Sequence, residues 1–369
     1  MKNFIKINNP EYFLLLFFGY IYYIFVLYDN HISLNFNYQY YLYDYNFGFI
    51  KRGLVGSICS LLFSKVSEST FVAISTVILV ILGIGIVKII DHINFKNKFY
   101  GYFLVSLLVI CPAFLKNLWY DLGRLDIFGI LYCLFFLYPF KKTFLNIFLL
   151  LSPLILLIHE GFFLLWLPTY FVCWFIRKNM ILIKIDKIIL ISFIIISILV
   201  LFIVNHYGKL SISFPIFQSY LKSKSNDINN FDYSTITGGN SIFKQIYSSI
   251  ILNFTHIKFW FLGIINFLSI GYIIVIFCRL LGINFKKYRV IYLPSVLTFM
   301  MFFLGCDALR WFSNMCISLY ILLLCILVTN KDNISERKII DKNFSNDIYF
   351  LIFLLLAMMP LKKLGVLWW

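Results

Sequence analysis

The chain has 369 residues, of which 62% are hydrophobic and only 13% are charged, and its formal net charge is +16. About a quarter of the residues of a soluble protein are charged, so this composition excludes an ordinary water-soluble domain. The Lys and Arg residues stand in short clusters between long apolar runs. This pattern indicates loops at a membrane surface and not a basic face that binds phosphates, so we expect no nucleic-acid partner.

The apolar runs predict an all-α, polytopic integral membrane protein, a single transmembrane domain over residues 1–369. A helix of roughly twenty mostly apolar residues crosses the hydrocarbon core of a bilayer. On this criterion we expect about eleven transmembrane helices. In chain order they are Tyr12–Tyr28, Phe71–Ile90, Tyr102–Leu118, Ile127–Phe140, Phe144–Ile158, Gly161–Ile176, Ile188–Val204, Ile257–Cys278, Val290–Gly305, Phe312–Thr329 and Ile348–Pro360.

The distribution of Lys and Arg predicts a cytoplasmic N-terminus. Loops on the cytoplasmic side of a membrane are rich in these residues. With the N-terminus inside and the spans alternating, almost all the basic clusters fall on the cytoplasmic side. They are Lys96 with Lys98, Lys141 with Lys142, Arg177 with Lys178, Lys184 with Lys187, Arg279 with Lys286, Lys287 and Arg289, and the stretch 331–342.

Three other segments are not expected to cross the membrane. Gly53–Phe63 is apolar but too short for a span, and counting it as one would move the later basic clusters outside; we predict a helix along the outer interface. Residues 205–254 are predicted to form a long extracytoplasmic loop, and residues 331–347 a charged cytoplasmic connector. A loop as long as 205–254 is usually either functional or disordered.

Ionisable side chains next to membrane spans are costly and therefore mark candidate functional sites. On this topology, four separate segments bring such side chains to the outer face. They are Asp44, Lys51 and Arg52 in the first loop; Asp121, Arg124 and Asp126 after the third span; His159 and Glu160 between the fifth and sixth; and Asp307 and Arg310 between the ninth and tenth.

These residues have two interpretations. Asp121 and Arg124, like Asp307 and Arg310, are three positions apart, so each pair can close a local salt bridge on one helix. Alternatively, Arg offers a planar cationic fork for phosphate or diphosphate oxygens. His159 beside Glu160 interrupts an apolar stretch and can act in proton transfer. No second His or Glu set at metal-ligand spacing accompanies them, so we predict no metal and no other cofactor.

In length, span number, long outer loop and Arg-bearing outer face, the chain resembles bacterial O-antigen and capsule repeat-unit polymerases. The resemblance implies glycosyl transfer at the outer face of a bacterial inner membrane, joining undecaprenyl-diphosphate-linked oligosaccharides. It also implies membrane lipid and a chain-length regulator as partners. On this reading His159 or Glu160 deprotonates the attacking sugar hydroxyl and the 205–254 loop covers the glycan. Diphosphate would be bound by Arg52, Arg124, Arg310 and Lys51, supported by Asp121, Asp126 and Asp307.

Two alternatives remain open. The chain is also similar to polytopic glycosyltransferases that use polyprenyl-phosphate sugars, which carry an acidic residue in the first outer loop followed by helices on the membrane surface. Asp44 followed by Gly53–Phe63 fits that arrangement, and Asp44 would then be the catalytic base. A flippase for lipid-linked oligosaccharides belongs to a different class. It would need polar residues through the middle of the membrane, and the sequence has few of them.

Overall fold

The computed structural model of the chain describes residues 9–27, 37–115, 117–118, 121–225, 257–304 and 307–336, together with Tyr247 and Ile251. Within these ranges every regular element is a helix and no strand occurs. Five helices are long and apolar enough to cross a membrane, namely Glu68–Ile93, Lys184–Tyr207, Gly263–Leu280, Phe285–Leu304 and Ala308–Thr329. Shorter apolar helical segments are Glu11–Ile21, Phe99–Ile110, Asp126–Leu137, Lys142–Leu157 and Phe162–Arg177.

These segments overlap the first ten predicted spans, and the predicted eleventh, Ile348–Pro360, lies outside the described residues. The all-helical character is therefore confirmed, whereas the number of eleven crossings stays a prediction. The elements up to the middle of the chain are α2 (Glu11–Leu27), η1 (Gln39–Tyr41), η2 (Tyr45–Phe47), α4 (Leu54–Leu62), α5 (Glu68–Ile93), α6 (Phe99–Ile110), α7 (Pro112–Leu115), α8 (Asp126–Leu137), α9 (Lys142–Leu151) and η4 (Ser152–Leu157). They are followed by α10 (Phe162–Leu165), α11 (Leu167–Arg177), α12 (Lys184–Tyr207), α13 (Phe214–Lys224), α16 (Ile257–Leu280), η5 (Phe285–Tyr292), α17 (Leu293–Phe299), α18 (Met301–Leu304), α19 (Ala308–Thr329) and α20 (Lys331–Glu336).

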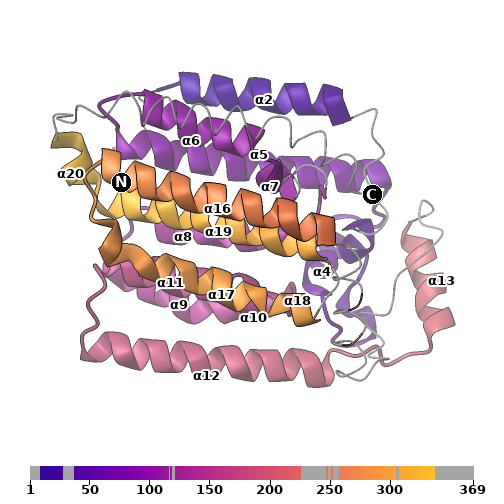
Figure 1. The fold of residues 1–369 in the computed structure, drawn as a ribbon. Coiled ribbons are helices and arrows are strands. Elements are labelled where there is room, and N and C mark those ends of the chain that lie inside the picture. The colour runs from indigo at the N-terminus through magenta and orange to yellow at the C-terminus, as the bar shows by residue number, and fades with distance from the viewer. Residues whose placement is uncertain are drawn as a thin grey trace.

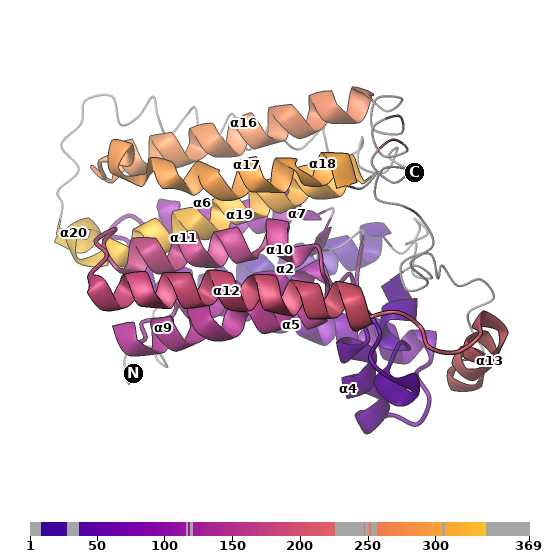
Figure 2. The same cartoon turned by 90° about the horizontal axis from the view of Figure 1, so that it is seen from below.

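The long helices lie along one common direction, with α19 at the centre and α2 and α12 on opposite outer sides (Figures 1 and 2). In the most apolar 18-residue stretch of α19, 94% is buried, and the helix packs against α5, α8, α11, α16 and α17. In the most apolar 18-residue stretch of α12, only 22% is buried. Small residues allow such close packing between membrane helices. Gly263 of α16 is one example, because a Cβ there would lie 2.2 Å from the ring of Phe312.

Several spans are broken near one end of the bundle. Pro153 follows α9 and begins the 3₁₀ helix η4, and Pro168 occupies the first turn of α11 after a break at Trp166. Proline lacks a backbone N–H and is therefore favoured at the start of a helix and not in its interior. A further break at Met300 separates α17 from α18. These interruptions place irregular backbone beside the candidate site described below.

The two ends of the bundle carry different elements and different charges. One end, here called the α4 end, holds α4, α13 and the segment 37–53, and the opposite end holds α20 (Figure 1). The described basic clusters that were predicted to be cytoplasmic lie at the α20 end (Figure 1). They stand in the turn before α6, between α8 and α9, between α11 and α12, and around η5. The four candidate segments lie at the α4 end.

The short helix predicted within Gly53–Phe63 is present as α4, at the end of the bundle (Figure 1). A nine-residue helix is about 14 Å long and too short to span a bilayer. Its side toward the bundle includes Gly56, where a Cβ would lie 2.0 Å from the carbonyl oxygen of Tyr43. Its opposite side exposes Ile58, Leu61 and Leu62. This amphipathic arrangement is typical of a helix at a membrane interface.

The segment 205–254, predicted as a loop, contains the helix α13 within its described part. Phe217 and Leu221 are four residues apart, and both are buried. Phe217 packs against the rings of Tyr43 and Phe47. Contact with the 37–53 segment therefore gives this polar sequence a helix that its composition does not indicate. Residues 226–246 and most of 247–256 lie outside the described residues, as do residues 337–347 of the predicted connector, which begins with α20.

Candidate functional site

A network of titratable side chains lies at the α4 end of the bundle and includes residues from all four predicted segments, but neither Asp44 nor Lys51. It connects the turn before α4, the turn before α8, the turn before α10 and the start of α19. Its members are Arg52, Asp121, Arg124, Asp126, His159, Glu160, Asp307 and Arg310.

Arg52 and Glu160 form a bidentate ion pair. Arg52 Nη2 lies 2.6 Å from Glu160 Oε1, and Arg52 Nε lies 3.1 Å from Oε2. Arg52 Nη1 also donates to the hydroxyl of Tyr40 at 2.9 Å. Burial works to lower the pKa of Arg52, but the Glu160 carboxylate raises it above its usual value. Burial works to raise the pKa of Glu160, and Arg52 holds it far below the usual range. Both groups are therefore ionised at neutral pH.

The backbone of Arg52 adopts φ 61°, in the left-handed region that non-glycine residues rarely occupy. Arg52 lies within a turn that is closed by a hydrogen bond from the N–H of Gly53 to the carbonyl of Ile50. Strained backbone of this kind persists only where surrounding contacts fix it, and it is common at functional sites. Here the Glu160 and Tyr40 contacts hold the guanidinium in one place.

His159 lies between the two cationic forks. Its Nδ1 accepts from the N–H of Gly161 at 2.9 Å, and its Nε2 lies 3.2 Å from Arg310 Nη2. The ring stacks on Phe162 with centroids 5.3 Å apart. Burial, reinforced by Arg52, lowers the pKa of His159 well below its usual value, although Glu160 opposes this shift. The imidazole is therefore neutral at neutral pH, and Arg310 remains the cation beside it.

Arg310 is anchored by Asp126 of α8. Its Nε donates to Asp126 Oδ2 at 2.7 Å, and the other carboxylate oxygen accepts from the amide of Asn314 at 3.1 Å. Asn314 in turn accepts a hydrogen bond of 2.8 Å from Asn117. Asp126 is fully buried, so this chain of contacts supplies the partners that a buried carboxylate requires.

Arg124 is enclosed by carboxylates. It lies 2.7 Å from Asp121, 2.5 Å from Asp307 and 3.8 Å from Asp126. The local pair that was considered for Asp121 with Arg124 is present. The local pair that was considered for Asp307 with Arg310 is wrong. Asp307 pairs with Arg124, and Arg310 pairs with Asp126.

A polar cavity of about 420 Å³ adjoins this network. The candidate residues Lys51, Arg52, His159, Glu160 and Arg310 all line it, whereas Arg124 and its carboxylates do not. Arg124 therefore sits behind the cavity wall. The remaining lining residues come from α10, α12, α18 and α19 and are mostly apolar: Gly161, Phe163, Leu164, Leu201, Asn205, Met301, Leu304 and Trp311.

Two cationic groups at this cavity have hydrogen-bonding capacity left over. Lys51 Nζ donates to the side-chain carbonyl of Asn205 at 2.8 Å, and among the described residues it has no carboxylate within ion-pair distance. Arg310 donates from Nε to Asp126, its Nη2 lies 3.2 Å from His159 Nε2, and its Nη1 has no described partner. An anion that entered the cavity could therefore gain charge-assisted hydrogen bonds without breaking an existing ion pair.

Asp44 is a member of a different cluster. Its carboxylate is buried and accepts from the Tyr220 hydroxyl at 2.6 Å, from Asn46 and from the ammonium group of Lys224. It also caps η2. These contacts fasten α13 to the 37–53 segment, and Asp44 is not among the cavity-lining residues.

Three contributors to the site were not singled out in the sequence. Tyr40 and Asn205 hold Arg52 and Lys51, but they belong to an aromatic run and to the end of an apolar span, and neither pattern is distinctive. Asn314 does carry a usable signal, because it follows Arg310 by four residues and so shares its helix face. A comparison of the chain with protein-family models, curated proteins and solved structures finds no match.

Proposed function

We propose that this protein transfers a glycosyl group from a polyprenyl-diphosphate-linked donor to a sugar hydroxyl, in the cavity at the α4 end. The observation that carries the proposal is the cavity wall, on which the cations Lys51 and Arg310 stand beside the Arg52–Glu160 pair. The cations offer sites for the leaving diphosphate, and the carboxylate offers a proton acceptor within the same space.

The proposed reaction divides the work between the lining residues. The oxygen of the acceptor hydroxyl attacks the anomeric carbon, and the bond from that carbon to the diphosphate oxygen breaks, with its electron pair leaving on the diphosphate. Lys51 and Arg310 would stabilise the developing negative charge. The hydroxyl proton would move to Glu160, which is the more exposed member of the His159–Glu160 pair, at 21% against 7% for the side chains.

Glu160 can take the proton once its pairing with Arg52 is weakened, and a diphosphate in the same cavity would supply the competing negative charge. In the resting site its negative charge is matched by Arg52. Once Glu160 has taken a proton, the charge of Arg52 is no longer compensated, and that cation faces the same cavity as the leaving diphosphate. His159 would act as a positioning residue whose ring packs 3.2 Å from Arg310 Nη2. Asp126 would hold the same guanidinium from the opposite side.

The proposed location is the outer face of a bacterial inner membrane. The support is the distribution of charge, because the basic clusters lie at the α20 end and cytoplasmic loops are rich in Lys and Arg. The candidate cavity, at the α4 end, would then face away from the cytoplasm. Polymerisation of exported repeat units would take place on that outer side. Of the described residues in the predicted 205–254 loop, Asn205 lines the cavity and α13 does not.

The proposal is tested with purified protein in lipid nanodiscs and a polyprenyl-diphosphate-linked oligosaccharide. Product length and release of polyprenyl diphosphate are measured for the wild type, for Lys51→Gln and for the control Lys65→Gln, which alters an exposed lysine at the same end of the bundle. We expect Lys51→Gln to lower kcat by about 100-fold, since loss of one group that stabilises transition-state charge typically costs this much, and Lys65→Gln to leave it unchanged.

Deletion of the gene separates polymerisation from other steps of glycan assembly. Gel display of the surface glycan would then show a ladder collapsed to a single repeat, since units would still be made and exported. Loss of even the single repeat would assign the protein to an earlier step, as a single-sugar transferase or flippase. An unchanged ladder, or a fully active Lys51→Gln protein, would contradict the proposal.

A further inference from the structure

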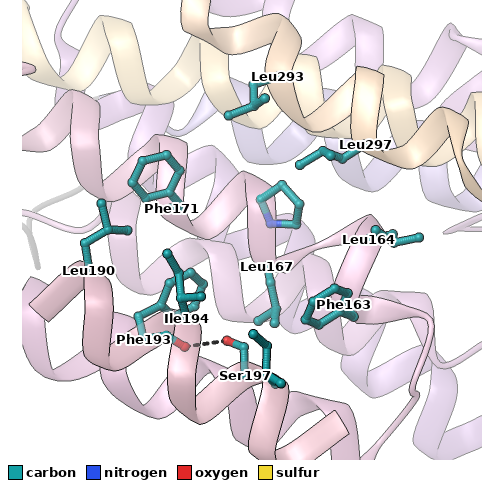
Figure 3. Close-up of a pocket in the computed structure, with 12 residues that line it drawn as sticks. Phe163, Leu164, Leu167, Phe171, Leu190, Phe193, Ile194, Ser197, Leu293 and Leu297 are labelled. Carbon is teal, nitrogen blue, oxygen red and sulfur yellow. Dashed lines mark hydrogen bonds between the residues drawn. The ribbon is translucent and has the colours of Figure 1, made fainter.

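A second, apolar cavity of about 320 Å³ lies deeper in the bundle, between α12 and α17. Its floor is formed by α10 and α11, and Figure 2 shows these two helices between α12 and α17. In Figure 3, Leu293 and Leu297 of α17 face Phe193, Ile194 and Ser197 of α12 across it. Its one lining hydroxyl, that of Ser197, is already bonded to the carbonyl of Phe193, so the walls present a hydrocarbon surface.

The apolar and polar cavities adjoin each other, and together they are here called the groove. Phe163 and Leu164 line both of them. Along α12 the lining continues from Leu190 through Ile198 in the apolar cavity to Leu201 and Asn205 in the polar one. Leu190 and Asn205 are fifteen positions apart, which corresponds to about 22 Å along a helix. The groove therefore follows much of the thickness of a hydrocarbon core.

The apolar part also opens sideways. Ile194, Ile198 and Leu293 on its rim are 46%, 56% and 38% exposed, whereas Leu167 on its floor and Phe193 on its α12 wall are buried. In a bilayer this opening faces lipid, so a hydrocarbon chain can enter from the side without passing through water. The polar end of the same groove carries Lys51 and Arg310, which suit a phosphate group.

We propose that this groove binds a single-chain polyprenyl phosphate or diphosphate, with the isoprenoid chain between α12 and α17 and the phosphate at Lys51 and Arg310. The assignment of this ligand rests on the proposed function, and the groove supplies what that function leaves open, the place of the lipid tail. One chain fits better than the two of a phospholipid, because the apolar cavity has a volume of only about 320 Å³.

The test measures binding and not turnover, so that its outcome is independent of glycosyl transfer. Protein in nanodiscs is titrated with a long-chain polyprenyl phosphate and with its short geranyl counterpart. Ile194→Trp and Leu297→Trp fill the groove, whereas Ile195→Trp and Val296→Trp place the same side chain at exposed positions next to them that do not line it. We expect the two groove variants to weaken long-chain binding at least about tenfold, since displacing two buried methylene groups suffices for this.

The control variants and the short-chain ligand complete the design. Ile195→Trp and Val296→Trp should bind the long chain as the wild type does, and all variants should keep the weaker short-chain binding, which depends on Lys51 and Arg310. Equal long-chain affinities for groove and control variants would overturn the inference. So would equal or tighter wild-type binding of a dialkyl phosphate with the same number of carbons. Chain-length-dependent binding without glycan product would leave the groove in place and contradict only the proposed reaction.

Discussion

At the scale of single residues, the site is a set of buried charges in which each group depends on its partners. Arg310 and Asp126 are 6% and 0% exposed, so neither charge has water to compensate for a lost partner. Removing one member of a buried ion pair typically costs roughly 3–5 kcal/mol, because the other charge is left unpaired. Replacing both by apolar residues of similar size is often nearly neutral.

A double-mutant cycle on this pair follows from that argument. We expect Arg310→Met alone to lower the free energy of unfolding by roughly 3–5 kcal/mol and Asp126→Leu with Arg310→Met to lower it by less. Unfolding of the detergent-solubilised protein by denaturant measures both. If the loss of unfolding free energy in the double variant equalled the sum of the losses in Arg310→Met and Asp126→Leu, the pair would not interact as the 2.7 Å contact indicates.

His159 predicts a pH dependence of stability. Because burial lowers its pKa in the folded protein, the unfolded chain binds more protons as the pH falls below about 6.5. Stability should therefore be fully present above that pH and fall below it, by at most about 1.4 kcal/mol per pH unit for one such group.

The contribution of His159 is isolated by His159→Asn. Unfolding free energies measured from about pH 7.5 to about pH 5.5 should decline less steeply for His159→Asn than for the wild type. Identical slopes for the two proteins would mean that His159 titrates normally and is not enclosed by Arg52 and Arg310.

At the scale of elements, two short helices are held in place by contacts that extend beyond their own sequence. The α13 helix is fixed through Asp44, which binds both Tyr220 and Lys224. The α4 helix approaches the carbonyl of Tyr43 so closely that only glycine fits at position 56. Because Arg52 lies immediately before α4, the position of this helix also sets the position of the Arg52 guanidinium.

Gly56→Ala tests this dependence. The added methyl group would meet the Tyr43 carbonyl at 2.0 Å, so α4 must shift. We expect a loss of roughly 1–3 kcal/mol of unfolding free energy, the usual cost of overpacking. In Ser60→Ala the lost hydroxyl bonds only to Ser57 within the same helix, and the change should be within about 0.5 kcal/mol. Thermal unfolding of both variants in one detergent gives the comparison, and equal midpoints would contradict the close contact.

At the scale of the whole molecule, the bundle has a basic end at α20 and a mixed-charge end at α4 that holds the cavity and its buried ion pairs. Transfer of a charged loop across a membrane is unfavourable, and Lys and Arg are retained on the cytoplasmic side. The direction in which the cavity faces therefore follows from the asymmetry between the two ends. This direction decides whether the cavity meets substrates that have already been exported.

Cysteine labelling of intact cells tests the orientation. Lys65→Cys lies at the α4 end and Lys286→Cys at the α20 end, and both positions are exposed. A membrane-impermeant maleimide should label Lys65→Cys directly and Lys286→Cys only after the membrane is permeabilised. The seven cysteines that the structure describes are buried, and the parent protein serves as the background control. The reverse pattern would place the cavity in the cytoplasm.

The sequence by itself determined the membrane class, the approximate places of the described spans and the segments that carry the candidate charges. These follow from local properties, because the free energy of moving an apolar run into lipid depends on that run alone. The short helix within Gly53–Phe63 was predictable for the same reason. The helix α13 was not, since its apolar side exists only as a contact with Tyr43 and Phe47.

Only the tertiary structure decided which charges meet. Sequence spacing suggested Asp307 with Arg310, but the packing of α8 against α19 gives Arg310 to Asp126 and Asp307 to Arg124. It also placed Lys51 and Arg310 at the cavity, Arg124 behind it and an apolar groove beside them. The reason is physical: ion pairs and cavities depend on distances between helices far apart in the chain, and those distances are set by how the whole bundle packs.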